Sequence, residues 1–296
     1  MPFTHLLLAL GVVAAWAFNF VAIKVGLADL PPLFMAAVRF VLTAIPFVFF
    51  IRPPKAPPLR VVAYGLLTFT LQFAFLFTGM TLGVSPAMAA LVLQVSAFVT
   101  IALAAVVWGE RMGAMQVAGA LVAVSGLVII GLHIEGDSAL PGLLMVLLAA
   151  ASWGAGNVVG KSIGKVDMLA LVVWAGLVPP LPLFALSLWL EGPQRIAAAG
   201  AHLTLAGALG VAYVVYVSTH LGYTAYAWLL SRHPAATVAP FTMLVPPLAA
   251  VFSALVLGET FPAWKLGAGA LVLAGVVINL FGPRLARRLV GTAQAR

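Results

Sequence analysis

Long apolar stretches, broken at intervals by proline, glycine and charged residues, follow one another along the whole chain. A helix that crosses a bilayer needs about 20 mostly apolar residues. The breaks separate ten stretches of about this length, so we predict helices at residues 5–27, 33–51, 59–80, 86–108, 113–132, 141–161, 168–190, 203–230, 235–257 and 263–282. The pattern is typical of an all-α integral membrane protein with ten transmembrane helices.

Composition indicates that a lipid bilayer surrounds this chain. Of its 296 residues, 64% are hydrophobic and only 7% are charged, whereas soluble domains carry about 25% charged residues. The net charge of +8 comes from basic residues scattered between apolar runs, a distribution that argues against a nucleic-acid partner. The chain has no cysteine, which excludes disulfides and thiolate ligands, and we expect neither a cofactor nor a bound metal.

A stretch near the end of the chain repeats an earlier one. Residues 105–131 align with residues 254–280 at an offset of 149, and eight of the 27 positions are identical, including the Gly-Glu pairs at 109/110 and 258/259. A second match, at an offset of 137, pairs Trp16 with Trp153 and Lys24 with Lys161. We therefore predict two five-helix repeats at residues 1–132 and 141–282, an inter-repeat external loop at 133–140, and a basic cytoplasmic tail at 283–296.

Lysine and arginine residues gather at one end of the predicted helices. Eleven lie on the side that carries both termini, whereas Arg195 and Lys265 lie on the other side. Because loops rich in Lys and Arg stay in the cytoplasm, both termini are predicted to be cytoplasmic. Glu110 then falls in a cytoplasmic turn and its repeat counterpart Glu259 in an external one. The two halves are therefore predicted to be inverted, as in many alternating-access transporters.

The Trp-x-x-Asn start of the first helix, at Trp16 and Asn19, and the Gly-Glu turn after the fourth helix of each half resemble the EamA family of the drug/metabolite transporter superfamily. The resemblance extends over essentially the whole chain. It implies a multi-pass protein of the bacterial inner membrane that exports small metabolites, often amino acids and including aromatic ones. It also implies a central cavity walled by both halves, with a small-molecule substrate and the lipid bilayer as partners. Five scattered histidines and the lack of membrane acids provide no nucleophile, metal cluster or pair of carboxylates, so we expect no enzyme activity. We expect the protein to function as a monomer.

Polar side chains inside a span are costly in lipid and normally face the bundle interior or a solute path. On this basis, and with aromatic side chains added, the candidate substrate-binding residues are Trp16, Asn19, Gln72, Phe77, Gln94, Trp153, Asn157, Tyr216, His220 and Tyr223. Lys24, Arg39 and Lys161 are the candidates for gating or charge recognition.

The predicted helix at 203–230 carries the longest row of these residues. Tyr213, Tyr216, His220 and Tyr223 lie at positions i, i+3, i+7 and i+10, which places them on one face of an α-helix. This face either lines the cavity or is an aromatic packing stripe with polar tips at the interface. The mid-span position of His220 favours the cavity.

Trp16 and Trp153 lie at matched positions in the first predicted helix of each half, so an inverted repeat places them across a pseudo-twofold axis. Such rings could hold the ammonium group of an amino acid by a cation–π contact of about 0.5 to 2 kcal/mol. The alternative is a place in the interfacial aromatic belt. Asn157 falls one position later than the counterpart of Asn19, so the two asparagines are not exact repeat partners.

The charged candidates and the glutamines have structural alternatives as well. Lys24 and Lys161 either extend their side chains to the headgroups or act as gates. Arg39 is predicted to form a structural ion pair with Asp29, with the external interface and the substrate as alternatives. Gln72 and Gln94 bind substrate or join helices, at about 0.6 kcal/mol each.

All seven acidic residues fall in predicted loops, so the sequence offers no intramembrane carboxylate for a proton relay. We therefore predict facilitated or potential-driven export by alternating access. Proton-coupled drug or metabolite efflux is the alternative, and a water-filled channel is a more remote one. Gly119 and Gly126, like Ala268 and Gly275, are spaced by seven on one helix face, which predicts close helix packing.

Overall fold

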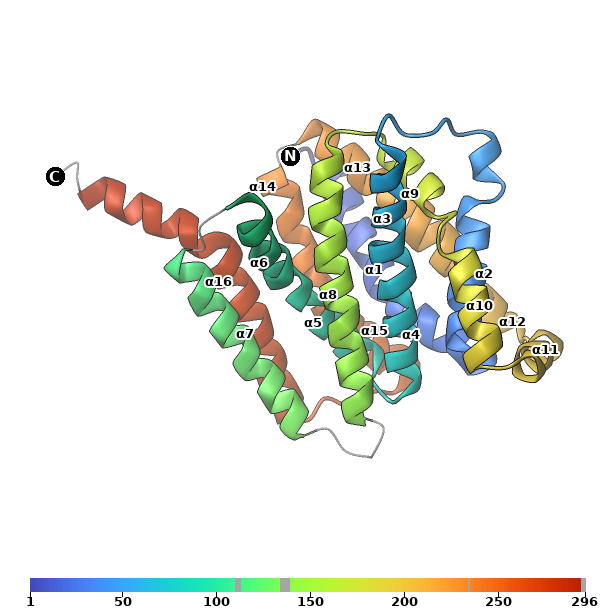
Figure 1. The fold of residues 1–296 in the computed structure, drawn as a ribbon. Coiled ribbons are helices and arrows are strands. Elements are labelled where there is room, and N and C mark those ends of the chain that lie inside the picture. Colours follow the sequence, from blue (N-terminus) through green and yellow to red (C-terminus); the bar gives the residue numbers. More distant parts are fainter. Residues whose placement is uncertain (110–112, 134–138, 234, 294–296) are drawn as a thin grey trace.

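The computed structural model describes residues 1–109, 113–133, 139–233 and 235–293, and these residues form helices and turns without a strand (Figure 1). The α-helices are α1 Phe3–Asp29, α2 Pro32–Ala44, α3 Pro58–Tyr64, α4 Gln72–Thr81, α5 Pro86–Val92, α6 Ser96–Trp108, α7 Ala114–Leu132, α8 Ala139–Ile163, α9 Met168–Ala175, α10 Pro180–Leu190, α11 Pro193–His202, α12 Leu205–Ala212, α13 Gly222–Arg232, α14 Ala235–Val238, α15 Val245–Leu257 and α16 Ala263–Ala293. Short 3₁₀ or π segments are η1 Phe47–Phe49, η2 Gly65–Leu71, η3 Leu93–Val95, η4 Tyr213–Leu221 and η5 Ala239–Leu244.

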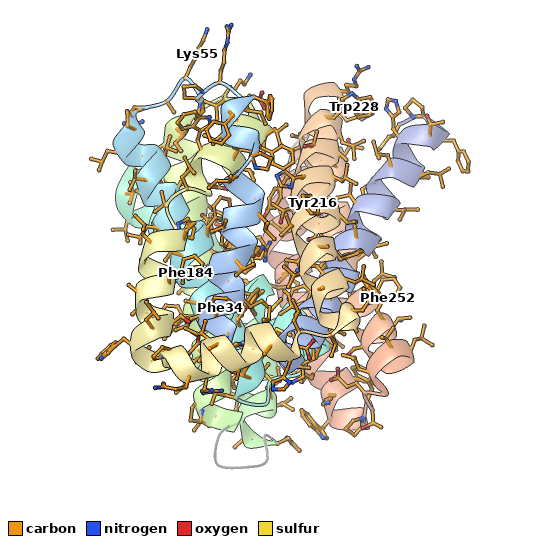
Figure 2. All side chains as sticks on the ribbon, turned by 90° about the vertical axis from the view of Figure 1, so that its right-hand side faces the viewer. Phe34, Lys55, Phe184, Tyr216, Trp228 and Phe252 are labelled. Atoms are coloured by element: carbon orange, nitrogen blue, oxygen red, sulfur yellow. The ribbon has the colours of Figure 1, made fainter. Side chains whose placement is uncertain are left out.

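The predicted all-α membrane fold is confirmed. Within the described residues, nine helical stretches are long and apolar enough to cross a bilayer, and a shorter apolar helix covers Phe241–Leu257. This shorter helix belongs to the ninth predicted span, which η5 interrupts before α15 begins. Pro246 and Pro247 stand in the first turn of α15, where proline is tolerated because the backbone N–H has no helical partner there. One helix was not predicted: α11 lies across the spans within the connection that follows α10 (Figure 2).

The two halves interlock. Each of the main packed pairs joins a first-half helix to a second-half helix: α7 with α16, α4 with α8, α1 with α12, α2 with α10, and α5 with α15. In Figure 1, α1 begins and α16 ends at the same end of the bundle, which we call the terminal end. The other end, where α1 stops and α11 lies, is called the opposite end.

The pairing of α7 with α16 displays the inversion directly. A Cβ atom added to Gly119 would lie 2.6 Å from the carbonyl oxygen of Gly275, and one added to Gly126 would lie 2.7 Å from that of Ala268. Gly119 is the repeat counterpart of Ala268, and Gly126 is that of Gly275. If each residue of one contact is replaced by its repeat counterpart, the other contact results, as is expected for contacts across a twofold axis. The chain runs in opposite directions in the two helices. The predicted close packing is confirmed.

Two π-helical segments, η2 and η4, lie at equivalent positions of the two halves. In η2 the Thr70 hydroxyl donates to the carbonyl oxygen of Gly65 at 3.3 Å, and in η4 the Thr219 hydroxyl donates to that of Val214 at 2.8 Å. Both threonines and both carbonyls are related by the same offset of 149. π-Helical turns inside α-helices are frequent at functional sites, so these segments direct attention to the middle of the bundle.

A carboxylate from the second half fixes the start of α2. Glu191 is buried at the end of α10, and its two oxygens accept from the backbone N–H groups of Leu33 at 2.7 Å and Phe34 at 3.0 Å. The first N–H groups of a helix lack helical partners and carry partial positive charge, so a carboxylate there is favourable. The rings of Phe34 and Phe184 meet beside this contact, with centroids 5.8 Å apart (Figure 2). This end of α2 is therefore held in place for the arginine that follows.

Candidate substrate site

Arg39 is a buried cation between the two halves. Its side chain rises from α2, is only 3% exposed, and donates from Nη2 to the Thr219 hydroxyl of η4 at 3.0 Å. Its Cζ atom lies 3.8 Å from the centre of the Phe73 ring. The Nε and Nη1 atoms have no hydrogen-bond partner in the described part of the chain.

The predicted ion pair between Arg39 and Asp29 is wrong. Asp29 ends α1 at the opposite end of the bundle and accepts from the backbone N–H of Thr204 at 2.9 Å and from its hydroxyl at 2.5 Å. Arg39 lies about two turns into α2 and faces Phe73 and Thr219, so the two charges point to different neighbours. Across the described residues, Arg39 therefore has no acidic partner.

Tyr223 connects Trp16 to this cation. The indole N–H of Trp16 donates to the carbonyl oxygen of Ser218 in η4 at 3.0 Å. Its ring lies 5.6 Å from that of Tyr223 and 5.0 Å from that of Tyr226, measured between centroids. Tyr223 is in turn close enough to Arg39 to interact with it electrostatically. The fold thus links three residues named from the sequence: Trp16 contacts Tyr223, and Tyr223 interacts with Arg39.

The matched tryptophan of the second half has a different environment. Trp153 is half-buried and packs against the core, and its indole N–H has no hydrogen-bond partner in the part of the chain that the structure describes. Asn157, one turn further along α8, is exposed and donates to the Thr100 hydroxyl at 3.2 Å. The two halves therefore share the position of the tryptophan and differ in what surrounds it.

The prediction that the tyrosines and His220 of residues 203–230 share one helix face is wrong. Tyr213 contacts α1, where its hydroxyl donates to the carbonyl oxygen of Ala15 at 3.2 Å. His220 turns instead to α2 and η1, with Nε2 3.0 Å from the carbonyl oxygen of Thr43, while Tyr216 is 43% exposed beside it (Figure 2). A π-helix bonds residue i to i+5 and winds more widely than an α-helix, so α-helical spacing across η4 no longer selects one face.

Three amide side chains have free hydrogen-bonding capacity. Asn19 is 8% exposed and its Oδ1 atom is buried without a partner. Gln72 is buried and Gln94 half-buried, and the described residues provide neither with a hydrogen-bond partner. Phe77 is fully buried against the edge of Phe73, which makes it a packing residue in this conformation.

Of the two matched lysines, Lys24 lies near the opposite end of the bundle and Lys161 near the terminal end. Lys24 donates to the carbonyl oxygen of Met80 at 3.3 Å, which joins α1 to the end of α4. Lys161 is exposed and places its ammonium 4.2 Å from the centre of the Trp108 ring.

Sequence reasoning missed two neighbours of Arg39. Phe73 follows Gln72 directly, and Thr219 precedes His220. An apolar ring and a small hydroxyl residue carry little signal inside a hydrophobic span, because both also occur as ordinary packing residues. Only the fold shows that they enclose the guanidinium.

Inverted five-helix halves with buried, incompletely paired polar groups between them define the class of the protein: a membrane transporter built from repeats. The sequence model of the EamA-like transporter family matches residues 3–132 and 140–281. The chain belongs to this family, as the sequence motifs predicted.

Relatives of known name and one solved structure extend this finding. The chain is 41% identical to a probable amino-acid metabolite efflux pump of Salmonella typhimurium, over 95% of this chain and 96% of the relative. It is 38% identical to a probable amino-acid metabolite efflux pump of Escherichia coli, over 94% and 95% of the two chains. A crystal structure that shares 20% identity superposes with a TM-score of 0.63 over 98% of this chain and 99% of the other, which supports the fold.

Proposed function

We propose that this protein exports amino acids and similar small metabolites that carry a free carboxylate, by alternating access. Support comes from relatives named as amino-acid metabolite efflux pumps and from one structural observation, the unpaired guanidinium of Arg39. We further propose that both termini lie in the cytoplasm, because basic residues concentrate at the terminal end. A place in the bacterial inner membrane and a monomeric state are part of the same proposal.

The Arg39 guanidinium carries this proposal because a buried charge is costly unless it is paired and hydrogen-bonded. Thr219 satisfies one nitrogen, and Nε and Nη1 remain without acceptors. A carboxylate is the anion that arginine binds with strong, charge-assisted hydrogen bonds. The carboxylate of a bound amino acid would supply the charge that the described residues do not.

The neighbouring aromatic and amide groups suit the remainder of an amino acid. Trp16 and Tyr223 offer ring faces to an ammonium group or an apolar side chain. The unpaired Oδ1 atom of Asn19 offers an acceptor for an ammonium N–H. Gln72, Gln94, Trp153 and Asn157 are assigned to the wall that the substrate passes as the two halves rock, with the solute's own gradient or the membrane potential as the driving force.

Counterflow of labelled amino acids into proteoliposomes tests the role of Arg39. We compare each amino acid with the amine that lacks its carboxylate, in wild type, Arg39→Met and the exposed control Arg195→Met. Hydrogen bonds to a charged group contribute about 1.5 to 3 kcal/mol each, so Arg39→Met should reduce amino-acid counterflow by roughly tenfold or more. Amines should be poor substrates of every variant, and Arg195→Met should resemble wild type. Equal transport of amines and amino acids by wild type would refute carboxylate recognition.

Proton-coupled export is the second candidate, and the surroundings of His220 favour it. Its Nδ1 lies 2.9 Å from the carbonyl oxygen of Val215 and its Nε2 lies 3.0 Å from that of Thr43. Carbonyl oxygens only accept, whereas a neutral imidazole has a single N–H. Both ring nitrogens of this mid-span histidine therefore face carbonyl oxygens, one in η4 and one in α2. Efflux that follows an imposed pH gradient in wild type but not in His220→Gln would select this mechanism over facilitated export.

A further inference from the structure

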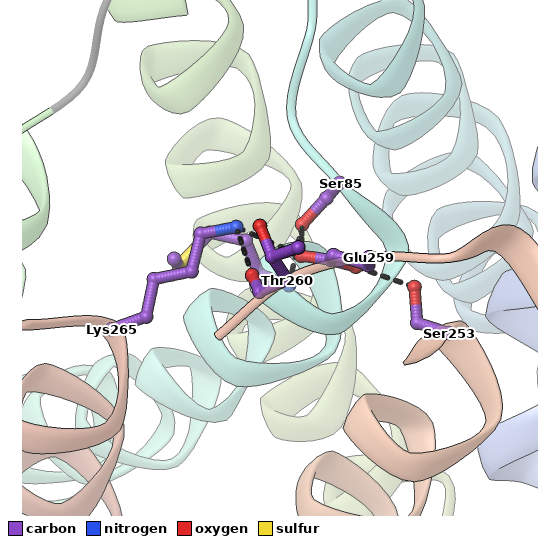
Figure 3. A network of polar contacts seen from close by, with 6 residues as sticks. Ser85, Ser253, Glu259, Thr260 and Lys265 are labelled. Carbon is purple, nitrogen blue, oxygen red and sulfur yellow. Dashed lines mark hydrogen bonds and ion pairs between the residues drawn. The ribbon is translucent and has the colours of Figure 1, made fainter. Parts of the chain in front are cut away.

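Glu259 is the centre of a polar network (Figure 3), in the turn between α15 and α16 at the opposite end of the bundle (Figure 1). It follows Gly258, whose φ of +67° permits the turn between α15 and α16. Its Oε1 accepts from the Ser85 hydroxyl and, at 3.1 Å, from the Lys265 ammonium, and its Oε2 accepts from the Ser253 hydroxyl. The side chain of Glu259 is 10% exposed, so a mostly buried carboxylate has three donors.

This network joins the two repeats. Ser85 is the N-cap of α5 in the first half, whereas Ser253 lies in α15 and Lys265 in α16 of the second half. Glu259 and Lys265 are also the charged residues in the wall of an otherwise apolar cavity of about 510 Å³ between α5, α15 and α16. Only one of the three donors, the Ser85 hydroxyl, therefore crosses from one half to the other.

The repeat shows that these partners are specific to one end of the molecule. Glu110 is the counterpart of Glu259, but the positions equivalent to Ser253, Lys265 and Ser85 are Ala104, Gln116 and Pro234. The Ser253 hydroxyl is thus replaced by a methyl group, the Lys265 ammonium by an amide, and the Ser85 hydroxyl by a proline ring without an N–H. Residues 110–112 and 234 lie outside the described residues, so this contrast rests on the sequence. The Gly-Glu turn is shared by the two repeats, and its three donors are not.

We infer that Glu259 is a gating residue: its bond to Ser85 holds the opposite end closed and breaks when the substrate leaves there. This inference rests on the proposed export function. Separation of α5 from α15 would cost Glu259 one of its three donors. Ser253 and Lys265 move with it, so the carboxylate stays compensated in the open state, and water can take the place of Ser85. A carboxylate with only the cross-repeat partner would be left as an uncompensated charge.

Because the chain has no cysteine, a single introduced cysteine reports opening at this end. Ala87 lies two residues after Ser85, lines the cavity and is only 6% exposed. We would introduce Ala87→Cys and measure its labelling by a membrane-impermeant maleimide added to the side that the opposite end faces. Loss of a hydrogen bond to a charged group should raise the labelling rate by about tenfold in Ser85→Ala and Glu259→Gln. The repeat control Glu110→Gln should leave the rate unchanged.

A second variant separates gating from helix capping, because the Ser85 hydroxyl also accepts from the N–H of Met88 at 3.4 Å. Aspartate is as good an N-cap as serine, yet Ser85→Asp places a second carboxylate against Glu259. A gate predicts fast labelling in Ser85→Asp, whereas a purely structural cap predicts the wild-type rate, and that rate would overturn the inference. An equal rise in Glu110→Gln would overturn it as well.

Counterflow in the same variants keeps this inference apart from the proposed function. The gate variants retain Arg39, so their apparent affinity for amino acids should stay near the wild-type value while labelling rises. If amino acids fail to bind in wild type, the proposed function fails, whereas a Ser85 variant that binds normally and labels at the wild-type rate rejects only the gate.

Discussion

The two π-helical segments are built alike and surrounded differently. Thr70 in η2 and Thr219 in η4 make the same hydrogen bond to the carbonyl oxygen five residues earlier. Thr219 also accepts from buried Arg39, and His220 follows it. Thr70 receives no such donor among the described residues, and Leu71 follows it. The shared backbone geometry belongs to the repeat, whereas the polar groups that could recognise a substrate belong to one copy.

This difference assigns distinct tasks to the two copies. Symmetric features, such as the glycine contacts between α7 and α16, hold helices close together. These contacts do not depend on the direction in which a helix crosses the membrane. Asymmetric features place a histidine and two tyrosines within η4 and bring Arg39 of α2 against it. Substitutions at paired positions should therefore have unequal effects, and each prediction below measures one such inequality.

The largest inequality is expected between Thr219→Val and Thr70→Val. Valine has nearly the same shape as threonine but lacks the hydroxyl. Thr219→Val removes the hydrogen bond between Thr219 and the Arg39 guanidinium, so counterflow of amino acids should fall by roughly tenfold. Thr70→Val loses only a bond within its own helix and should lower the stability in detergent by about 1 kcal/mol, with nearly normal transport. Equal losses of transport would remove the functional distinction between η2 and η4.

A smaller inequality is expected between Trp16→Phe and Trp153→Phe. Trp16→Phe keeps an aromatic ring but removes the donor to the Ser218 carbonyl oxygen, a contact worth about 1 kcal/mol. We expect roughly fivefold slower counterflow, since η4 is then less firmly held against α1. Trp153→Phe removes no hydrogen bond to a described residue and should change counterflow little. A larger defect in Trp153→Phe would place the more important tryptophan in the second half.

The sequence predicted the fold well, because ten apolar stretches, the basic-residue bias and the repeat all point to the same architecture. The spacing of the small residues predicted close helix packing, and the structure shows that α7 and α16 are the helices that pack there. Family membership also followed from short motifs whose order mattered more than their length. Such features can be recognised in the amino-acid sequence because a bilayer imposes both the length and the apolar character of every span.

The site was less predictable for two physical reasons. A π segment changes the direction of every side chain beyond it, so the row from Tyr213 to Tyr223 divides although its spacing fits one α-helical face. Pairing inside a membrane also depends on three-dimensional neighbours: Arg39 met Thr219 and Phe73 rather than the nearby acid Asp29. Neither outcome can be read from hydrophobic periodicity.

The smallest predicted effect is a pH dependence of stability at His233, whose repeat counterpart is Val84. Partial burial, together with the positive charges of His5, the N-terminus and Arg232, lowers the pKa of His233 below its usual value. The folded state therefore binds a proton here less readily than the unfolded state. Stability is retained above the unfolded pKa of about 6.5 and falls as the pH drops further.

Thermal unfolding in detergent between about pH 7 and pH 5 measures this effect, and His233→Gln should flatten the acid side of the curve by a small amount. His202→Gln, at the opposite end, is the matched control and should retain the wild-type slope. The Nδ1 of His5 lies 2.7 Å from Nε2 of His233, so His5→Gln should also reduce the slope, because one of the positive neighbours is removed. A wild-type slope in His233→Gln would show that the acid sensitivity arises elsewhere in the chain.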